Sequence, residues 1–215
     1  MPTPAPQLTF YFDIISPFAY LAFHRLLHSP LHAYTTYTPS FLSGIMVATS
    51  NRPPLTVPLK GAYIFHDLVR QAGRYGIPLL PAGKPANFPV STLYAMRVLC
   101  AVPEGRVVEV AERLFHVFWV QGRGVEREEV VKEVVEQVLG REAWEQVEKR
   151  IRTEGKKKLA ENTDEAVRKG AFGMPWFVVT DANGKEDVYW GFDHLDEVAA
   201  CMGLAMESRD GESKL

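Results

Sequence analysis

The sequence has little cysteine, since only Cys100 and Cys201 occur among its 215 residues. The two lie far apart, both in stretches with a helical pattern. A disulfide framework is therefore not expected, and the composition favours an intracellular protein. The sequence also lacks a Cys-x-x-Cys pair. We interpret its six histidines as structural residues, so no metal site is predicted.

The sequence also lacks a long apolar run and an excess of charge of one sign. No run approaches the ~20 apolar residues that a membrane-spanning helix needs. The 24 basic and 26 acidic residues are interleaved, and the net charge is −2, which favours neither nucleic acid nor a membrane as a partner. The hydrophobic content of 47% is enough to form a core.

The chain opens with the pattern of a strand, a turn and a helix. Leu8 to Asp13 is a short β-branched and aromatic run, which predicts a buried strand. Apolar residues then recur at helical spacing in FAYLAFHRLLH. Ser16 is a favoured N-cap and Pro17 a favoured first helical residue, so the helix is predicted to begin here.

The rest of the chain divides into strands and a long helical block. Tyr34 to Leu42 predicts a strand that ends near Pro39, and 50–58 predicts a loop. Residues 60–168 have an almost wholly helical pattern. The segment WFVVT, the DANG turn and the run 187–190 then predict a hairpin. A last helix follows, for which Asp193 can provide the cap.

This order predicts an α/β fold: a thioredoxin-like domain interrupted by an all-helical insertion domain. We assign 1–59 and 161–215 to the discontinuous thioredoxin-like domain and 60–160 to the insertion.

The turn at Ser16 is the first candidate site. A helix N-terminus stabilises an anion, which in thioredoxin-like folds is a thiolate. The turn Ser16-Pro17-Phe18-Ala19 contains no sulfur, so dithiol redox chemistry is excluded there. The Ser16 hydroxyl could donate a hydrogen bond to a thiolate of a ligand and lower its pKa. Alternatively, Ser16 only caps the helix.

Three further positions could bind a peptide. The Met174-Pro175 bond is predicted to be cis, which would leave the N–H and C=O of Met174 free to pair with an extended peptide. Alternatively, Pro175 is merely tolerated at the start of a strand. Asp193 could bind an α-ammonium group rather than cap a helix. Asn51, in a proline-rich loop, offers both donor and acceptor groups.

The order of these positions resembles one family. YFDIISPFAYLAF, NRPP with LKGAY, LYAMRVLCAV, EAVRKGAFGMPWFVV and WGFDHLDEVA are similar to segments of the kappa-class glutathione transferases and the related 2-hydroxychromene-2-carboxylate isomerases. The similarity spans about 8–203. It implies the fold derived above, a homodimer, and glutathione as co-substrate with a small hydrophobic electrophile, as in detoxification.

The resemblance also implies roles for single residues. Ser16 would activate the glutathione thiol, and Pro17 and Phe18 would line the site through the helix N-terminus. Asn51 and Met174 would hold the ligand. Phe192 and Asp193 would hold its γ-glutamyl end, although many relatives have a small hydroxyl residue in place of Phe192.

Three functions remain open at this point. The first is a glutathione transferase, and the second is a glutathione-dependent 2-hydroxychromene-2-carboxylate isomerase. The third is a non-catalytic protein that binds glutathione or a peptide.

The last three residues match a peroxisomal address. Ser213, Lys214 and Leu215 form the Ser-Lys-Leu signal that an import receptor reads. We therefore expect a peroxisomal protein, with a mitochondrial or cytoplasmic location as the alternative.

Overall fold

Both ends of the chain contribute to one sheet in the computed structural model, which describes residues 5–206. The strands are β1 (Gln7–Phe12), β2 (Thr35–Pro39), β3 (Trp176–Thr180) and β4 (Glu186–Trp190). Their order is β2-β1-β3-β4, with β1 parallel to β2 and antiparallel to β3. This confirms the predicted thioredoxin-like sheet. Ser213, Lys214 and Leu215 lie outside the described residues.

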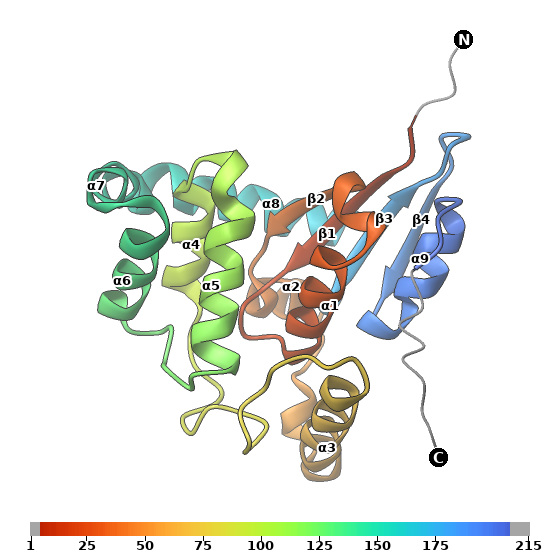
Figure 1. The fold of residues 1–215 in the computed structure, drawn as a ribbon, viewed down its shortest axis with the longest axis horizontal. Helices are drawn as coiled ribbons and strands as arrows, with labels where there is room; N and C mark the ends of the chain where they lie inside the picture. Colours follow the sequence, from red (N-terminus) through yellow and green to blue (C-terminus); the bar gives the residue numbers. More distant parts are fainter. Residues whose placement is uncertain (1–4, 207–215) are drawn as a thin grey trace.

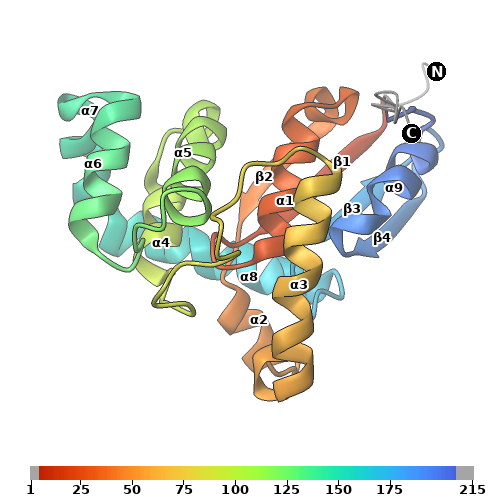
Figure 2. The ribbon, with the colours of Figure 1, turned by 60° about the horizontal axis from the view of Figure 1, so that its bottom comes forward.

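Residues 5–206 also form nine α-helices. They are α1 (Pro17–Leu27), α2 (Leu42–Ala48), α3 (Pro58–Arg74), α4 (Leu93–Ala101), α5 (Val107–Trp119), α6 (Glu128–Leu139), α7 (Arg141–Arg150), α8 (Lys156–Arg168) and α9 (Leu195–Cys201). Figure 1 shows α4 to α7 as a group beside the sheet, with α8 leading back to it. In Figure 2, α3 stands alongside α1. The helical block predicted for the middle of the chain is thus present, and its division into a separate domain stays a prediction.

Alternation along the strands explains how both faces of the sheet are covered. Phe10 of β1 and Phe177 of β3 belong to a large core that also contains residues of α1, α5 and α9, and their rings stack 5.2 Å apart. Their neighbours Tyr11 and Trp176 face the other way, into a smaller core with Ile45 of α2 and residues of α8. Because successive side chains point to opposite faces of a strand, continuous apolar runs give a sheet buried on both sides.

Two segments differ from the predicted elements. The strand ends at Pro39 as expected, but 42–48 form the helix α2. This short helix contains Gly44 and is a poor helix by propensity, so tertiary packing of Ile45 supports it. Residues 75–92 are not helical, contrary to expectation. Four prolines and two glycines in this stretch explain why an apolar pattern did not become a helix.

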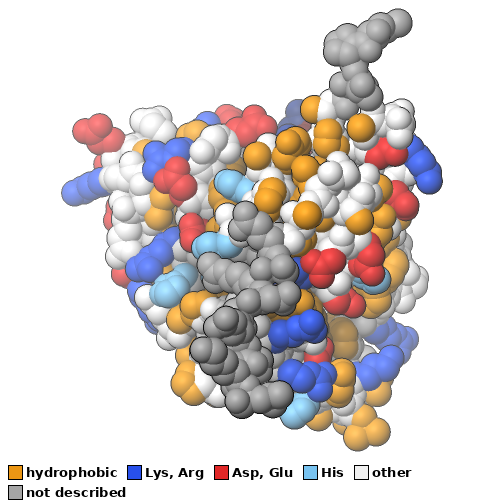
Figure 3. Space-filling view, turned by 45° about the vertical axis from the view of Figure 1, so that its right-hand side comes forward, with side chains coloured by type: hydrophobic (Ala, Val, Ile, Leu, Met, Phe, Trp, Pro, Cys, Tyr) orange, Lys and Arg blue, Asp and Glu red, His pale blue; other side chains and the backbone are white. Residues whose placement is uncertain are grey.

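Charges on the surface are mixed. Acidic and basic side chains are interspersed on the face shown in Figure 3, in keeping with the net charge of −2.

The segment between α7 and α8 lies very close to the backbone of α4. This segment is a π-helical turn, η4 (Ile151–Gly155). A Cβ atom at Gly155 would overlap with the backbone oxygen of Arg97 in α4. Only glycine allows the two segments to approach this closely.

We therefore expect Gly155→Ala to destabilise the protein by about 1–3 kcal/mol, the usual cost of overpacking. Gly73→Ala is the matched control, because Gly73 lies in α3 and a Cβ there meets nothing within 4 Å. That change should instead stabilise by about 0.5–1 kcal/mol. Urea unfolding measures both, and equal effects of the two changes would contradict the packing argument.

Candidate active site

Two adjoining cavities bring the predicted site residues together. The larger has a volume of about 660 Å³ and the smaller about 330 Å³, and Phe18, Met174 and Trp190 line both. Ser16, Pro17 and Asn51 line the larger cavity. Phe192 and Asp193 line the smaller. Every residue singled out in the sequence therefore lies on one continuous surface. Trp190 was missed as a site residue, because its place at the end of a strand gave no sign that it also lines a cavity.

Ser16 lies in the turn between β1 and α1 and lines the larger cavity. It is 4% exposed, and its hydroxyl oxygen accepts a hydrogen bond from the N–H of Ala19 at 3.2 Å. Ser16 is thus the N-cap of α1, as predicted, and Pro17 follows as the first helical residue. Its hydroxyl also donates to the carbonyl oxygen of Met174 at 3.1 Å. Ser16 therefore does more than cap the helix, because it also connects α1 to the start of β3.

The turn before β3 has the geometry expected for peptide pairing, with one correction. The Met174-Pro175 bond is cis, as predicted. The expectation that both backbone groups of Met174 lack a partner was wrong for the carbonyl, which accepts from Ser16. The reason is that the α1 N-terminus lies directly beside this turn. The N–H of Met174 has no hydrogen-bond partner among the described residues.

The N-terminus of α1 has the electrostatic character that favours an anion. Its first turn carries no acidic side chain, and the N–H of Phe18 has no hydrogen-bond partner in the described part of the chain. Unpaired N–H groups and the helix dipole stabilise negative charge at this point.

Asp13 is a structurally important residue that sequence reasoning missed. It is fully buried, and its carboxylate accepts hydrogen bonds from the Thr92 hydroxyl at 2.7 Å and the N–H groups of Leu42 at 2.9 Å and Ile15 at 3.1 Å. The three donor residues also line the larger cavity. Burial raises the pKa of Asp13 to about 6, and the hydrogen bonds oppose that rise.

The two cavities differ in charge. No acidic residue lines the larger cavity, where Arg52 and Lys60 have no ion-pair partner among the described residues. Asp67 and Asp193 line the smaller cavity. Asp67 is ion-paired with Arg70 and lines a further cavity together with Lys60, so Asp193 is the carboxylate of the smaller cavity that has no ion-pair partner among the described residues.

Asn51 connects the proline-rich loop to the segment before β3. Its side-chain amide donates to the carbonyl of Phe172 at 2.7 Å, and its side-chain oxygen accepts from the N–H of Arg52 at 2.8 Å. These contacts hold the loop beside Gly173 and Met174. A ligand-binding role for Asn51 stays a prediction.

Phe192 and Asp193 have different environments in the same turn. Phe192 is buried and stacks on Phe18 with ring centroids 5.7 Å apart. Asp193 is exposed and does not cap a helix, so the capping interpretation was wrong. The last helix begins two residues later, after a short 3₁₀ turn, and so Asp193 lies before the position where a cap would act.

Residues 5–206 were compared with the requirements of a metal site and of a membrane-spanning helix. His24 and His28 are four residues apart, but their rings stack 4.4 Å apart. No group of three or more potential ligands is found among the described residues. Likewise, none of the described helices has the length and apolar character needed to cross a membrane.

The thiol of Cys100 is partly buried and does not line either of the two cavities. It lies in α4, near the carbonyl of Pro39 and the amide of Asn162, and burial raises its pKa to about 12.

A serine-capped helix that begins beside a cis-proline turn, at the end of a mixed sheet, is typical of a thioredoxin-like protein, and comparisons with known proteins agree. Residues 7–203 match the DSBA-like thioredoxin domain family. Glutathione S-transferase kappa 2 from Caenorhabditis elegans is 33% identical, with 88% of each chain covered. A 2-hydroxychromene-2-carboxylate isomerase from Pseudomonas putida is 30% identical, covering 90% of this chain and 93% of the relative.

The solved structures include a close match in fold. A 2-hydroxychromene-2-carboxylate isomerase superposes with a TM-score of 0.77 at 25% identity, covering 91% of this chain and 94% of the other. The chain belongs to the DSBA-like thioredoxin domain family and, within it, to the enzymes that comprise kappa-class glutathione transferases and 2-hydroxychromene-2-carboxylate isomerases.

The buried carboxylate of Asp13 leads to a pH prediction. Folding raises the pKa from 3.8 to about 6, so the folded protein holds a proton that the unfolded chain has lost between these values. Stability from this group should therefore fall as pH rises from about 4 to about 6, by up to ~3 kcal/mol. Asp13→Asn removes this dependence.

Urea unfolding of both proteins across this range tests the prediction. The free energy of unfolding of Asp13→Asn minus that of the wild type should increase with pH, because the other carboxylates cancel in the difference. A difference that is independent of pH would refute the assignment.

Proposed function

We propose that this enzyme is a glutathione transferase that conjugates the thiolate of glutathione to small hydrophobic electrophiles. The observation that carries the proposal is the position of Ser16: at a helix N-terminus, beside a cis-proline turn, on a surface with Arg52 and Lys60 in one cavity and Asp193 in the adjoining one. A peptide with an ammonium group at one end, a carboxylate at the other and a thiol between them complements this surface.

Glutathione has these groups in this order, with a second carboxylate beside the ammonium on its γ-glutamyl α-carbon. Its cysteinyl backbone would pair with the N–H and C=O of Met174, as an added strand does. The γ-glutamyl α-ammonium would bind Asp193 in the smaller cavity. The glycyl carboxylate would lie toward Arg52 and Lys60. The thiol is then left beside Ser16.

The Ser16–Met174 contact supports a role for the hydroxyl in thiol activation. The Met174 carbonyl has two lone pairs and can also accept the ligand's N–H, and the Ser16 hydroxyl can rotate from this carbonyl to donate to the sulfur. A hydrogen bond to the thiolate, together with the helix dipole and the free N–H of Phe18, lowers the pKa of the bound thiol.

Transfer then follows without a protein nucleophile. The thiol gives its proton to solvent, and the thiolate attacks an electrophilic carbon such as that of an aryl halide. The carbon–sulfur bond forms and the halide leaves with its bonding electrons. Phe41, Phe65 and Phe88 line the larger cavity and give it an apolar wall for such a substrate.

The second candidate is glutathione-dependent isomerisation of a hydroxychromene carboxylate. The similarity to the isomerase from Pseudomonas putida favours it, as do the two unpaired cations in the larger cavity, which suit a substrate carboxylate. Turnover of a general aryl halide distinguishes transfer from isomerisation, and absence of both activities would leave a non-catalytic glutathione-binding protein. A homodimer and a peroxisomal location stay predictions.

Ser16→Ala should lower kcat about 10- to 1000-fold, the scale of losing one well-placed donor to a developing anion. The pKa of bound glutathione should rise, because the thiolate loses a hydrogen bond, while glutathione affinity falls much less. Steady-state kinetics and the ultraviolet absorbance of the thiolate measure these effects.

Ser43→Ala is the matched control, because Ser43 lines the same cavity but makes no side-chain hydrogen bond among the described residues. It should leave kcat unchanged. Since Ser16 is also an N-cap, its replacement costs about 1 kcal/mol, so assays belong well below the melting temperature. Wild-type kcat in Ser16→Ala would disprove the catalytic role.

Asp193→Asn should weaken glutathione binding by about 1.5–3 kcal/mol, the range for hydrogen bonds to charged groups. This corresponds to roughly ten- to 150-fold in Kd. Thermal stability should not change, since Asp193 makes no capping contact. Calorimetric titration measures the Kd, and a change of less than about twofold would exclude Asp193 from the ammonium site.

A further inference from the structure

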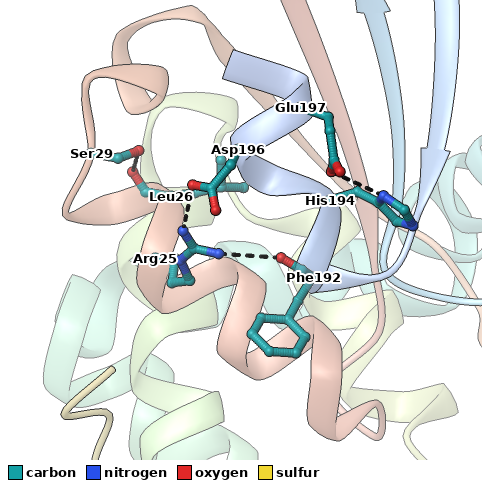
Figure 4. A network of polar contacts seen from close by, with 7 residues as sticks. All are labelled: Arg25, Leu26, Ser29, Phe192, His194, Asp196 and Glu197. Carbon is teal, nitrogen blue, oxygen red and sulfur yellow. Dashed lines mark hydrogen bonds and ion pairs between the residues drawn. The ribbon is translucent and has the colours of Figure 1, made fainter. Parts of the chain in front are cut away.

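Arg25 reaches from α1 to the turn that carries Phe192 and Asp193. Its guanidinium donates a long hydrogen bond of 3.4 Å to the carbonyl of Phe192 and forms an ion pair of 3.0 Å with Asp196 at the start of α9. Figure 4 shows the guanidinium placed between these two acceptors. The side chain of Arg25 is only 9% exposed, so this is a held contact rather than a mobile surface charge.

Aromatic rings complete the enclosure of Arg25. Its guanidinium lies over the ring of Tyr75, 4.3 Å from the centroid. The edge of Tyr75 in turn contacts the ring of Phe192, with centroids 6.0 Å apart. Arg25 therefore holds the turn by its hydrogen bond to the Phe192 carbonyl, and Tyr75 supports the turn by packing against the Phe192 ring.

The turn needs such support because its backbone is unusual and Asp193 does not anchor it. Gly191 has a φ of +104°, a conformation that disfavours side chains. The side chain of Asp193 makes no hydrogen bond or ion pair among the described residues. Its position in the smaller cavity is set by its neighbours.

The pairing with Asp196 also determines the charge available in the cavity. A lone guanidinium near this turn would attract Asp193 and neutralise it. Because Arg25 is already paired with Asp196, the carboxylate of Asp193 stays free for a cationic ligand group.

We propose that Arg25 is a positioning residue for the ammonium site: it fixes the 191–193 turn while leaving the charge of Asp193 unpaired. This inference rests on the proposed glutathione function. Arg25 touches no reacting atom, and its effect should be confined to ligands that carry the γ-glutamyl ammonium group.

The test compares two ligands on Arg25→Met, which keeps an apolar stem over Tyr75 but removes the charge and the donors. The ligands are glutathione and deaminoglutathione, in which a hydrogen replaces the α-ammonium. Arg25→Met should raise the Kd of glutathione about tenfold and change that of deaminoglutathione less than twofold. In the Asp193→Asn background, Arg25→Met should cause no further loss.

Two variants of α9 provide a matched pair. Asp196→Asn frees the guanidinium to turn toward Asp193 and should weaken glutathione selectively, and it serves as the test if Arg25→Met does not fold. Glu197→Gln makes the same type of change one residue away, where the partner is His194, and should be neutral.

The outcomes separate this inference from the proposed function. An unchanged glutathione Kd in Arg25→Met, or an equal loss for both ligands, would overturn the positioning role while wild-type binding keeps the proposed function intact. Absence of glutathione binding to the wild type would overturn both.

Discussion

The hydrogen bond from Ser16 to the carbonyl of Met174 joins residues 158 positions apart in the chain, and the site depends on it. It brings the start of α1 against the cis-proline turn, and neither element alone forms a binding surface. A hundred or so residues of helix lie between them in sequence and must return the chain to within hydrogen-bond distance. The antiparallel pairing of β1 with β3 makes this return possible, because it places the end of one strand beside the start of the other.

The same contact limits what the ligand-free site can do. The Ser16 hydroxyl has one proton, and it donates this proton in a hydrogen bond to the Met174 carbonyl, so the hydroxyl has no donor left for a group in the cavity. In the proposed function, a peptide ligand pairs with that carbonyl and brings its sulfur to the hydroxyl as an alternative acceptor, so pairing places the thiol for activation.

Local chemistry explains which elements could be predicted from the sequence. Ser16 and Pro17 begin α1 because the cap and the missing N–H of proline act within a single turn. The hairpin at Asp181 and Gly184 likewise depends on nearby residues. The prolines and glycines of 75–92 are also a local signal, and they indicate that this segment is not a helix. Helix α2 and the roles of Asp13 and Arg25 could not be predicted this way. Each depends on donors or rings contributed by distant segments, for which a single sequence carries no periodic signal.

Burial raises the pKa of both the Asp13 carboxyl and the Cys100 thiol, but their hydrogen-bond partners differ. Asp13 has donors that partly offset its burial, whereas the Cys100 thiol has only weak contacts, and its pKa rises to about 12. At neutral pH this sulfur stays protonated and poorly nucleophilic. In the proposed transferase reaction, bound electrophiles could also alkylate cysteines of the protein. Partial burial and a raised pKa make Cys100 a weak competitor for the sulfur of glutathione in that proposed reaction.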